Sequence, residues 1–127
     1  MDGSHTHEKT VLVVDDDPAV CELIQEILKP YPYHVLTAHD GLEAIDHTNR
    51  HHIDLILMDI RLPLFSGIWF CDAFKKKHNT ANIPIVMVSA LMDELNEEKS
   101  RRAGACATVK KPFGCDELLR VVEQNAL

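Results

Sequence analysis

Three adjacent carboxylates, Asp15, Asp16 and Asp17, directly follow the apolar residues 11–14, which have the composition of a buried strand. Two unit charges about 4 Å apart repel by about 4 kcal/mol at the effective dielectric of a protein surface, so the cluster needs a positive partner. Asp17 precedes Pro18, and this pair is typical of the N-cap and first residue of a helix. Asp15 and Asp16 are therefore the carboxylates left to bind a cation.

Three further side chains that can take part in chemistry stand at or just after the ends of later apolar runs: Asp59, Ser89 and Lys111. A hard divalent cation such as Mg²⁺ prefers carboxylate oxygens and the oxygens of a phosphate. A lysine amine and a serine hydroxyl suit phosphoryl oxygens as a compact charge and a small donor. Because positioned cations and donors supply most of what phosphoryl transfer requires, these residue types predict that chemistry, with Mg²⁺ neutralising the acid cluster.

The hydrophobic pattern shows how the chain brings these groups together. We expect strands at residues 10–15, 34–38, 53–59, 83–90 and 106–110, and helices at about 18–28, 41–50, 67–78, 91–104 and 115–125. Strict alternation predicts an α/β fold in which a doubly wound parallel sheet carries helices on both faces. Ligands of such sheets bind at the carboxyl ends of the strands, and all five candidate side chains fall there.

Length and composition limit the classes of function. With 127 residues and a formal charge of −7, the chain is expected to form one domain, and its charge disfavours direct contact with nucleic acid or an anionic membrane. Its four cysteines show no CxxC spacing, and no apolar stretch has the length of a signal-peptide core or a membrane span. We expect a cytoplasmic domain at residues 9–127 after a flexible segment at 1–8, in which His5 and His7 belong to an unstructured end.

Five stretches, in order, carry a resemblance to a known family. They are "VLVVDDDP" at 11–18, "LILMDIRLP" at 55–63 with Gly67 after it, "IPIVMVSA" at 83–90, "AGA" at 103–105 and "KPF" at 111–113. From residue 9 to about 123 the sequence resembles the receiver domain of two-component response regulators, including the chemotaxis regulators. The resemblance implies a flavodoxin-like, five-stranded sheet in the order 2-1-3-4-5, and a signalling domain rather than a turnover enzyme.

The resemblance also implies roles for the acidic residues. Asp59 would be the phosphoacceptor, which takes its phosphoryl group from a sensor histidine kinase or a histidine phosphotransfer protein. Mg²⁺ would be the cofactor, bound directly by Asp16 and largely through water by Asp15. Asp59 and the backbone carbonyl of Arg61 would complete its protein ligands.

The resemblance assigns the remaining polar groups to the phosphoryl oxygens, which Ser89 and Lys111 would hold. Lys111 is chosen over its neighbour Lys110 because the family places its lysine directly before a proline. That peptide bond is typically cis in the family, and an X-Pro bond adopts this minority state at modest cost. We therefore predict a cis bond between Lys111 and Pro112.

The sequence departs from the family where the signal is read out. Counting back from Lys111, Thr108 stands where the family has an aromatic ring that turns inward on phosphorylation. The conformational change then either uses other groups, such as the loop after Ser89, or is muted. Arg61 and Leu91 occupy positions that in the family flank the attacking water. There they would shield the acyl phosphate from hydrolysis; the alternative is that Arg61 lies in solvent. Trp69 is expected to face outward from its helix.

Two other functions remain as alternatives. A pseudo-receiver would keep the fold and act as a binding module without phosphorylation; the missing ring favours it, and the complete set of acids, serine and lysine opposes it. A phosphatase of the haloacid dehalogenase class follows a strand with D-x-D-x-T/V, but Ala19 stands at the last position of that motif. Both a stand-alone receiver and a part of a larger regulator or hybrid kinase fit the sequence.

Overall fold

The computed structural model describes residues 8–127, in which five strands alternate with five helices. The strands are β1 Lys9–Val14, β2 Tyr33–Ala38, β3 Leu55–Met58, β4 Ile85–Ser89 and β5 Ala107–Lys110. The helices are α1 Pro18–Leu28, α2 Gly41–Arg50, α3 Gly67–Lys76, α4 Glu94–Arg102 and α5 Cys115–Asn125. Apart from Glu8, the expected flexible segment 1–8, with His5 and His7, lies outside the described residues.

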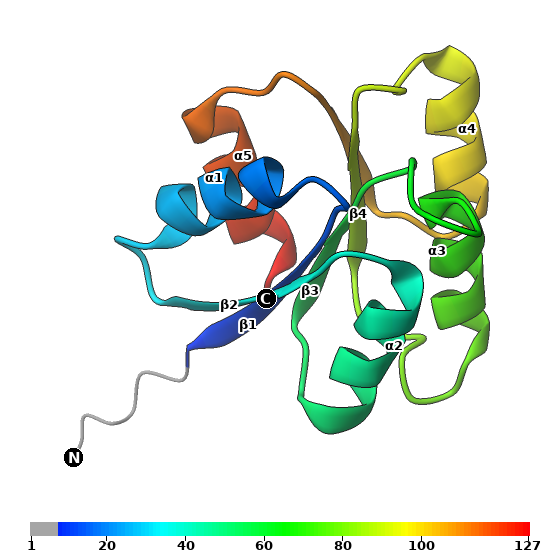
Figure 1. Cartoon of the computed structure of the whole chain (residues 1–127), viewed down its shortest axis with the longest axis horizontal. Coiled ribbons are helices and arrows are strands. Elements are labelled where there is room, and N and C mark those ends of the chain that lie inside the picture. The colour runs from blue at the N-terminus through cyan, green and yellow to red at the C-terminus, as the bar shows by residue number, and fades with distance from the viewer. Residues whose placement is uncertain (1–7) are drawn as a thin grey trace.

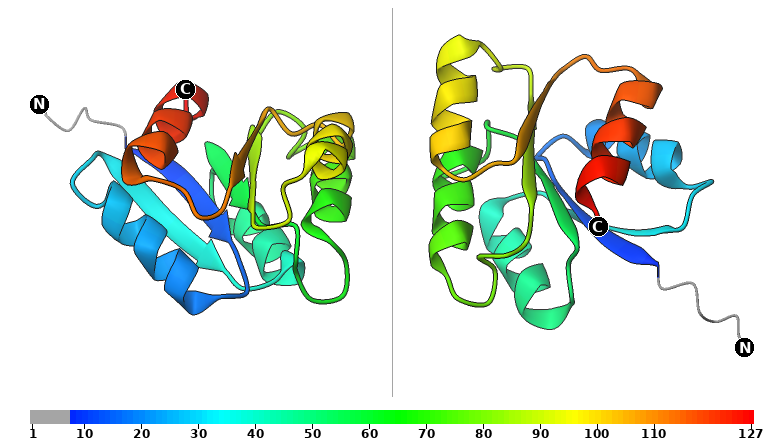
Figure 2. Two further views of the ribbon diagram at one scale, coloured as in Figure 1. Left: turned by 90° about the horizontal axis from the view of Figure 1, so that it is seen from above. Right: turned by 180° about the vertical axis from the view of Figure 1, so that it is seen from behind.

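The strands form one parallel sheet in the order β2-β1-β3-β4-β5, which confirms the predicted fold class. Helices α1 and α5 cover one face of the sheet, and α2, α3 and α4 cover the other (Figure 1, Figure 2). The chain changes direction across the sheet between β1 and β3, which are paired to each other. The carboxyl ends of these two strands are therefore the place where a ligand site is expected.

The central strands of the sheet are buried on both faces, and this explains why β3, and β4 up to Ser89, are apolar throughout. Every residue of β3 and β4 is buried. In β1, Leu12 and Val14 belong to the core under α2 and α3, whereas Val11 and Val13 belong to the core under α1 and α5. Because successive side chains of a strand point to opposite faces, each strand serves two cores at once.

Side-chain caps decide where several helices begin. Asp17 accepts a hydrogen bond from a backbone N–H in the first turn of α1, as predicted. Helix α4 begins at Glu94 rather than at 91, because Asp93 caps it in the same way. Helix α3 ends at Lys76 rather than at 78, because Lys77 adopts an extended backbone.

Helix α4 is weakly anchored to the sheet. Of its nine residues only Ser100 is buried, and the Oγ atom of Ser100 has no hydrogen-bond partner among the described residues. The other residues of the helix are largely charged or polar, and the buried apolar side chains Met92 and Ala103 lie just outside its two ends. The helix therefore rests on the sheet through little apolar surface of its own.

Gly67 lies where the chain leaves β3 and enters α3, and it leaves no room for a side chain. A Cβ atom at Gly67 would lie 1.8 Å from the backbone oxygen of Asp59, and the Gly67 N–H donates to the Ile60 carbonyl at 2.7 Å. We expect Gly67→Ala to lower the free energy of unfolding by about 3 kcal/mol, because backbone must move to make space. Urea denaturation measures this loss.

Gly114 offers the matched control for that experiment. A Cβ atom there meets no atom within 4 Å, so Gly114→Ala is expected to change the unfolding free energy by less than about 1 kcal/mol. Equal effects of the two substitutions would show that the loop after β3 moves aside without cost.

Candidate functional site

The predicted site residues meet in one shallow pocket at the carboxyl edge of the sheet. The pocket has a volume of about 210 Å³ and is lined by Asp15, Asp16, Asp17, Asp59, Arg61, Ser89, Ala90, Leu91 and Lys111. All six residues that the sequence assigned to the site are among them. The fold thus joins side chains that lie up to 96 positions apart in the chain.

Backbone hydrogen bonds between neighbouring strand ends fix where each of these side chains starts. The Asp59 N–H donates to the carbonyl of the last residue of β1 at 2.9 Å, and the Asp15 N–H donates to that of β2 at 3.0 Å. The Lys111 N–H donates to the carbonyl of Ser89 at 3.0 Å. The Lys111–Pro112 peptide bond is cis, which confirms that prediction.

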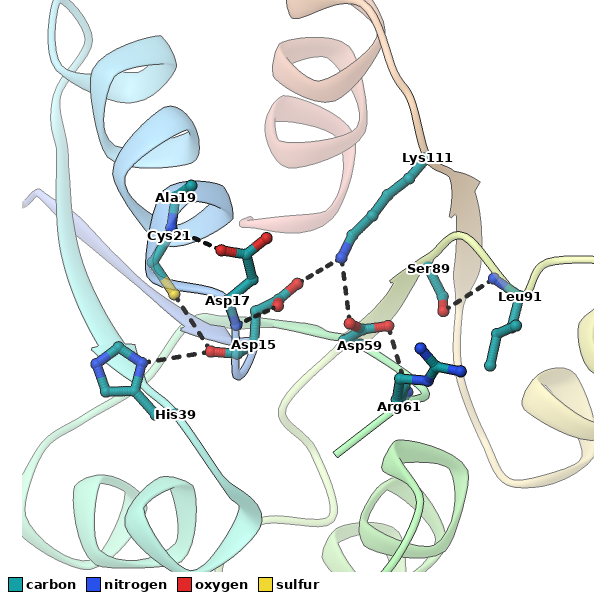
Figure 3. A network of polar contacts seen from close by, with 10 residues as sticks. All are labelled: Asp15, Asp17, Ala19, Cys21, His39, Asp59, Arg61, Ser89, Leu91 and Lys111. Carbon is teal, nitrogen blue, oxygen red and sulfur yellow. Dashed lines mark hydrogen bonds and ion pairs between the residues drawn. The ribbon is translucent and has the colours of Figure 1, made fainter. Parts of the chain in front are cut away.

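Lys111 bridges the two buried carboxylates of the pocket. Its Nζ atom donates to Asp15 Oδ2 at 2.6 Å and to Asp59 Oδ2 at 3.1 Å, as Figure 3 shows. Burial lowers the pKa of Lys111, but the Asp15 hydrogen bond and the two negative charges outweigh this and leave the pKa raised. The ammonium group is therefore charged at neutral pH and offsets the repulsion between the carboxylates.

Asp15 and Asp16 occupy different environments, although they are adjacent in sequence. Asp15 is buried, and burial raises its pKa, with a smaller contribution from the charge of Asp59. The hydrogen bond from Lys111 and that from the Asp17 N–H to Asp15 Oδ1, at 2.9 Å, act in the opposite direction. Asp16 is exposed at the rim of the pocket, where it is open to a ligand from solvent.

The acidic residues of the pocket have the geometry to share one cation. One carboxylate oxygen from each of Asp15, Asp16 and Asp59 lies within 4.8 Å of the others. Carboxylate oxygens suit Mg²⁺, which binds one or two of them directly and reaches further ligands through the waters that it keeps. The donor set therefore fits the cation that the sequence predicts.

Two backbone N–H groups turn toward the functional side chains from the loops that follow them. The Arg61 N–H donates to Asp59 Oδ1 at 3.3 Å, and the Leu91 N–H donates to Ser89 Oγ at 3.2 Å. In Figure 3 the side chains of Arg61 and Leu91 lie on the side of Asp59 that faces Ser89. Their residue types thus combine a cation and an apolar group at the mouth of the pocket.

Two residues beside the pocket were not predicted from the sequence. Cys21 Sγ donates to the carbonyl of Asp15 at 3.5 Å, and His39 Nδ1 lies 3.4 Å from the same oxygen. Burial raises the pKa of Cys21 to about 11, so it is a protonated thiol at neutral pH. Both contacts arise from the packing of α1 and β2 beside β1, for which a single sequence carries no local signal.

The family model of the response regulator receiver domain matches residues 11–123. The chain belongs to this family. The match includes every residue that lines the pocket. The protein is thus a receiver domain of two-component signalling, a class of signalling domain.

Curated relatives of this receiver domain are response regulators. The polar-differentiation response regulator DivK of Brucella ovis is 31% identical over 115 residues, which cover 91% of this chain and 94% of the relative. DivK of Brucella anthropi is 30% identical over the same shares.

Solved structures share the fold over nearly the whole chain. A putative response regulator from Chloroflexus aurantiacus superimposes with a TM-score of 0.88 and 30% identity, over 93% of this chain and 97% of that one. The receiver domain of the sensor histidine kinase PA1611 from Pseudomonas aeruginosa has a TM-score of 0.84, 29% identity and the same coverage. Its structure has a magnesium ion coordinated in the active-site cleft.

Other residues that the sequence singled out lie away from the pocket of the receiver domain. Thr108 is half-buried on β5, and its hydroxyl donates to Glu97 Oε2 of α4 at 3.4 Å. Trp69 is exposed on α3, as expected. All four cysteines are free, and no helix among residues 8–127 is long and apolar enough to cross a bilayer.

Proposed function

We propose that this receiver domain accepts a phosphoryl group on Asp59 from a sensor histidine kinase or a histidine phosphotransfer protein. The observation that carries the proposal is the bridge from Lys111 to Asp15 and Asp59, in a pocket that also holds Asp16 and Ser89. A buried pair of carboxylates held by one lysine is costly for a purely structural site. A site that receives a phosphoryl group and a cation needs both the carboxylates and the lysine.

In the proposed step an Asp59 carboxylate oxygen attacks the phosphorus of a phosphohistidine. A P–O bond forms and the P–N bond breaks, and the imidazole leaves with the bonding electron pair and takes up a proton. Lys111, already within 3.1 Å of Asp59 Oδ2, stabilises charge on the transferred oxygens. The Ser89 hydroxyl oxygen accepts from the Leu91 N–H, so the hydroxyl proton of Ser89 is left to donate to a phosphoryl oxygen.

Asp15, Asp16 and Asp59 would hold Mg²⁺, with the backbone carbonyl of Arg61 as a further ligand. When bound, Mg²⁺ supplies positive charge to the phosphoryl oxygens and to the acid cluster. The magnesium ion in the cleft of the PA1611 receiver domain supports this assignment. Asp16 is the exposed member of the set and would bind directly, whereas buried Asp15 already accepts from Lys111 and would act largely through water.

We propose that the signal leaves through the loop between β4 and α4, in residues 90–93. The ring used by the family is replaced by Thr108, which contacts Glu97 and has no aromatic group to turn inward. The loop is bound to Ser89 by the hydrogen bond from the Leu91 N–H to Ser89 Oγ, and the Leu91 carbonyl accepts from Asn96 Nδ2 at 2.5 Å. A shift of Ser89 toward a phosphoryl group therefore pulls on the start of α4.

Small phosphodonors test the proposal without knowledge of the natural kinase. We expect acetyl phosphate with Mg²⁺ to add one phosphoryl group to the intact protein, and peptide mapping to place it on Asp59. Beryllofluoride with Mg²⁺, a stand-in for the acyl phosphate, should shift the amide resonances next to Asp59. Absence of both effects would identify a binding module that keeps the fold without phosphorylation, and a phosphoryl group on another residue would also contradict the proposal.

The lifetime of the acyl phosphate tests the position of Arg61. Arg61, which is exposed, and Leu91 line the mouth of the pocket, and we propose that they restrict the approach of water to Asp59. We expect Arg61→Ala to hydrolyse its acyl phosphate several-fold faster, in the range of about 2–10-fold. Loss of the phosphorylated mass over time measures this rate, and an unchanged or longer lifetime would show that Arg61 does not shield the site.

A further inference from the structure

An exposed aromatic patch lies beside the start of α3, and the proposed phosphoryl transfer makes no use of it. Phe65 and Trp69 stack with ring centroids 4.3 Å apart, and each leaves 49% of its surface exposed. Buried Phe70 meets Trp69 edge-on at 5.1 Å, and its ring lies where a side chain on Gly41 would otherwise be. The patch is therefore held in place by the core and forms a firm apolar surface.

Phe70, which meets both rings of the patch edge-on, also lines a groove between α2 and α3. Ile45 of α2 and Ala73 of α3 line this groove together. Leu42, which is 61% exposed, lies one turn before Ile45 on the same side of α2. We use the name α2–α3 seam for the surface formed by Leu42, Ile45, Phe65, Trp69 and Ala73.

The far end of the α2–α3 seam is basic, in a chain with a formal charge of −7. Lys75, Lys76 and Lys77 follow one another at the end of α3, and Lys75 Nζ donates to the backbone carbonyls of Ala81 and Ile83. Lys76 pairs with Asp72 at 2.9 Å, whereas Lys77 Nζ contacts the neutral Asn49 Oδ1 at 3.5 Å. Lys77 is exposed and open to a carboxylate from a partner.

The charges on these two helices favour a partner of different composition over a second copy of the chain. Asp46 pairs with Arg50 at 3.1 Å, as Asp72 does with Lys76, and Glu43 accepts from the His39 N–H. A second copy that offered the same face would bring engaged carboxylates and further lysines. A partner with its own free carboxylates complements the seam.

Leu64 adds an independent sign that this region meets a partner. It has a φ of 71° and is 83% exposed, in a turn closed by a hydrogen bond from the Phe65 N–H to the Pro63 carbonyl at 2.9 Å. A left-handed backbone is unfavourable for leucine, and so is an apolar side chain in water. An apolar partner that covers Leu64 recovers the second cost.

We propose that the α2–α3 seam binds an amphipathic helix of a partner protein. The apolar residues of that helix would cover Phe65, Trp69 and Leu64, and its glutamate or aspartate residues would meet Lys77 at the other end. Grooves between two helices recognise such helices through apolar anchors at i, i+3, i+4 and i+7. The seam lies outside the acid pocket, so the proposal does not rest on the phosphoryl chemistry of Asp59.

Trp69 is the only tryptophan of the chain and reports directly on the seam. The probe is a synthetic helical peptide with an apolar stripe in one half and glutamates in the other, made in both sequence directions. We expect one direction to shift the Trp69 emission to the blue, because the half-exposed indole becomes buried. The same peptide with lysine in place of glutamate should bind about tenfold more weakly.

Substitutions separate the seam from other apolar surfaces. Phe65→Ala, read out by isothermal titration calorimetry, should abolish binding of the glutamate peptide, and Lys77→Gln should weaken it. Leu95→Ala removes from α4 a leucine that is as exposed as Leu42 of the seam, and it should leave the affinity unchanged. Equal binding of the glutamate and lysine peptides, or no binding of either, would overturn the proposal. A Trp69 shift that depends only on protein concentration would also overturn it, because it would show self-association.

Discussion

Asp59→Asn is expected to abolish phosphorylation of this receiver domain by acetyl phosphate completely. The asparagine side chain keeps the size of the carboxylate but has no anionic oxygen to attack phosphorus, and no other carboxylate of the pocket stands in its place. Intact mass measured after incubation with the phosphodonor and Mg²⁺ reports the result. Asp116→Asn, which changes an exposed acid at the start of α5, should be phosphorylated like the unmodified protein.

The same variant has a second readout that does not depend on phosphorylation. The pKa of Asp15 is raised by burial in the first place and by the charge of Asp59 in addition. Removal of that charge in Asp59→Asn should therefore lower the pKa of Asp15, which carboxyl resonances measured against pH report. A phosphorylated variant, or an Asp15 that titrates as before, would contradict the assignment of Asp59 as phosphoacceptor and neighbour.

Lys111→Met should have the second large effect, on stability as well as on chemistry. Without the ammonium group, two buried carboxylates face each other unpaired, which costs about 3 kcal/mol of unfolding free energy at neutral pH. Phosphorylation should slow by about 10²-fold or more, because the cation that stabilises the transferred oxygens is lost. Urea denaturation and the rate of mass gain measure the two effects.

The pH dependence of that loss follows from Asp15. Lys111 holds down a pKa that burial raises, so Lys111→Met should raise the pKa of Asp15 further above its value in the unfolded chain. A carboxyl group with a raised pKa destabilises the fold as pH rises toward that pKa, and costs nothing once it is protonated in both states. The deficit of the variant should therefore shrink toward acid pH.

Lys110 provides the control for Lys111 at the neighbouring position. Its side chain is exposed at the end of β5, outside the pocket, so Lys110→Met should change neither stability nor phosphorylation appreciably. Mg²⁺ should restore stability to Lys111→Met more than to the unmodified protein, because the site then lacks its own cation. Equal effects of the two lysine substitutions would contradict the assignment of Lys111.

Much of this structure is predictable from the sequence because the polar groups of the site sit at strand ends. Apolar runs that stop at Asp15, Asp59 and Ser89 specify both the buried strands and the edge where their side chains gather. The order of the strands in the sheet is not predictable in this way, because the hydrophobic pattern alone does not specify which strand is central. Five matching stretches implied it through resemblance to the family, and the structure confirms it.

Features that depend on tertiary contact escaped the sequence. The contacts of Cys21 and His39 with the Asp15 carbonyl need α1 and β2 to pack beside β1.

The start of α4 was placed too early, because apolar Leu91 and Met92 look helical until Asp93 caps the helix. Competition between local pattern and a cap is decided by a single hydrogen bond, from the Asn96 N–H to Asp93 at 2.8 Å.

The weak anchoring of α4 has a consequence for the dynamics of the protein. A helix held by one buried serine, whose hydroxyl lacks a partner among the described residues, releases little apolar surface to water when it detaches. Local opening of such an element needs only a small part of the global unfolding free energy. We therefore expect the amide hydrogens of α4 to be among the first to exchange with solvent, and those of β1 and β3 to exchange only by global unfolding. On this expectation, the fluctuations of the native state are largest in the helix that follows Ser89.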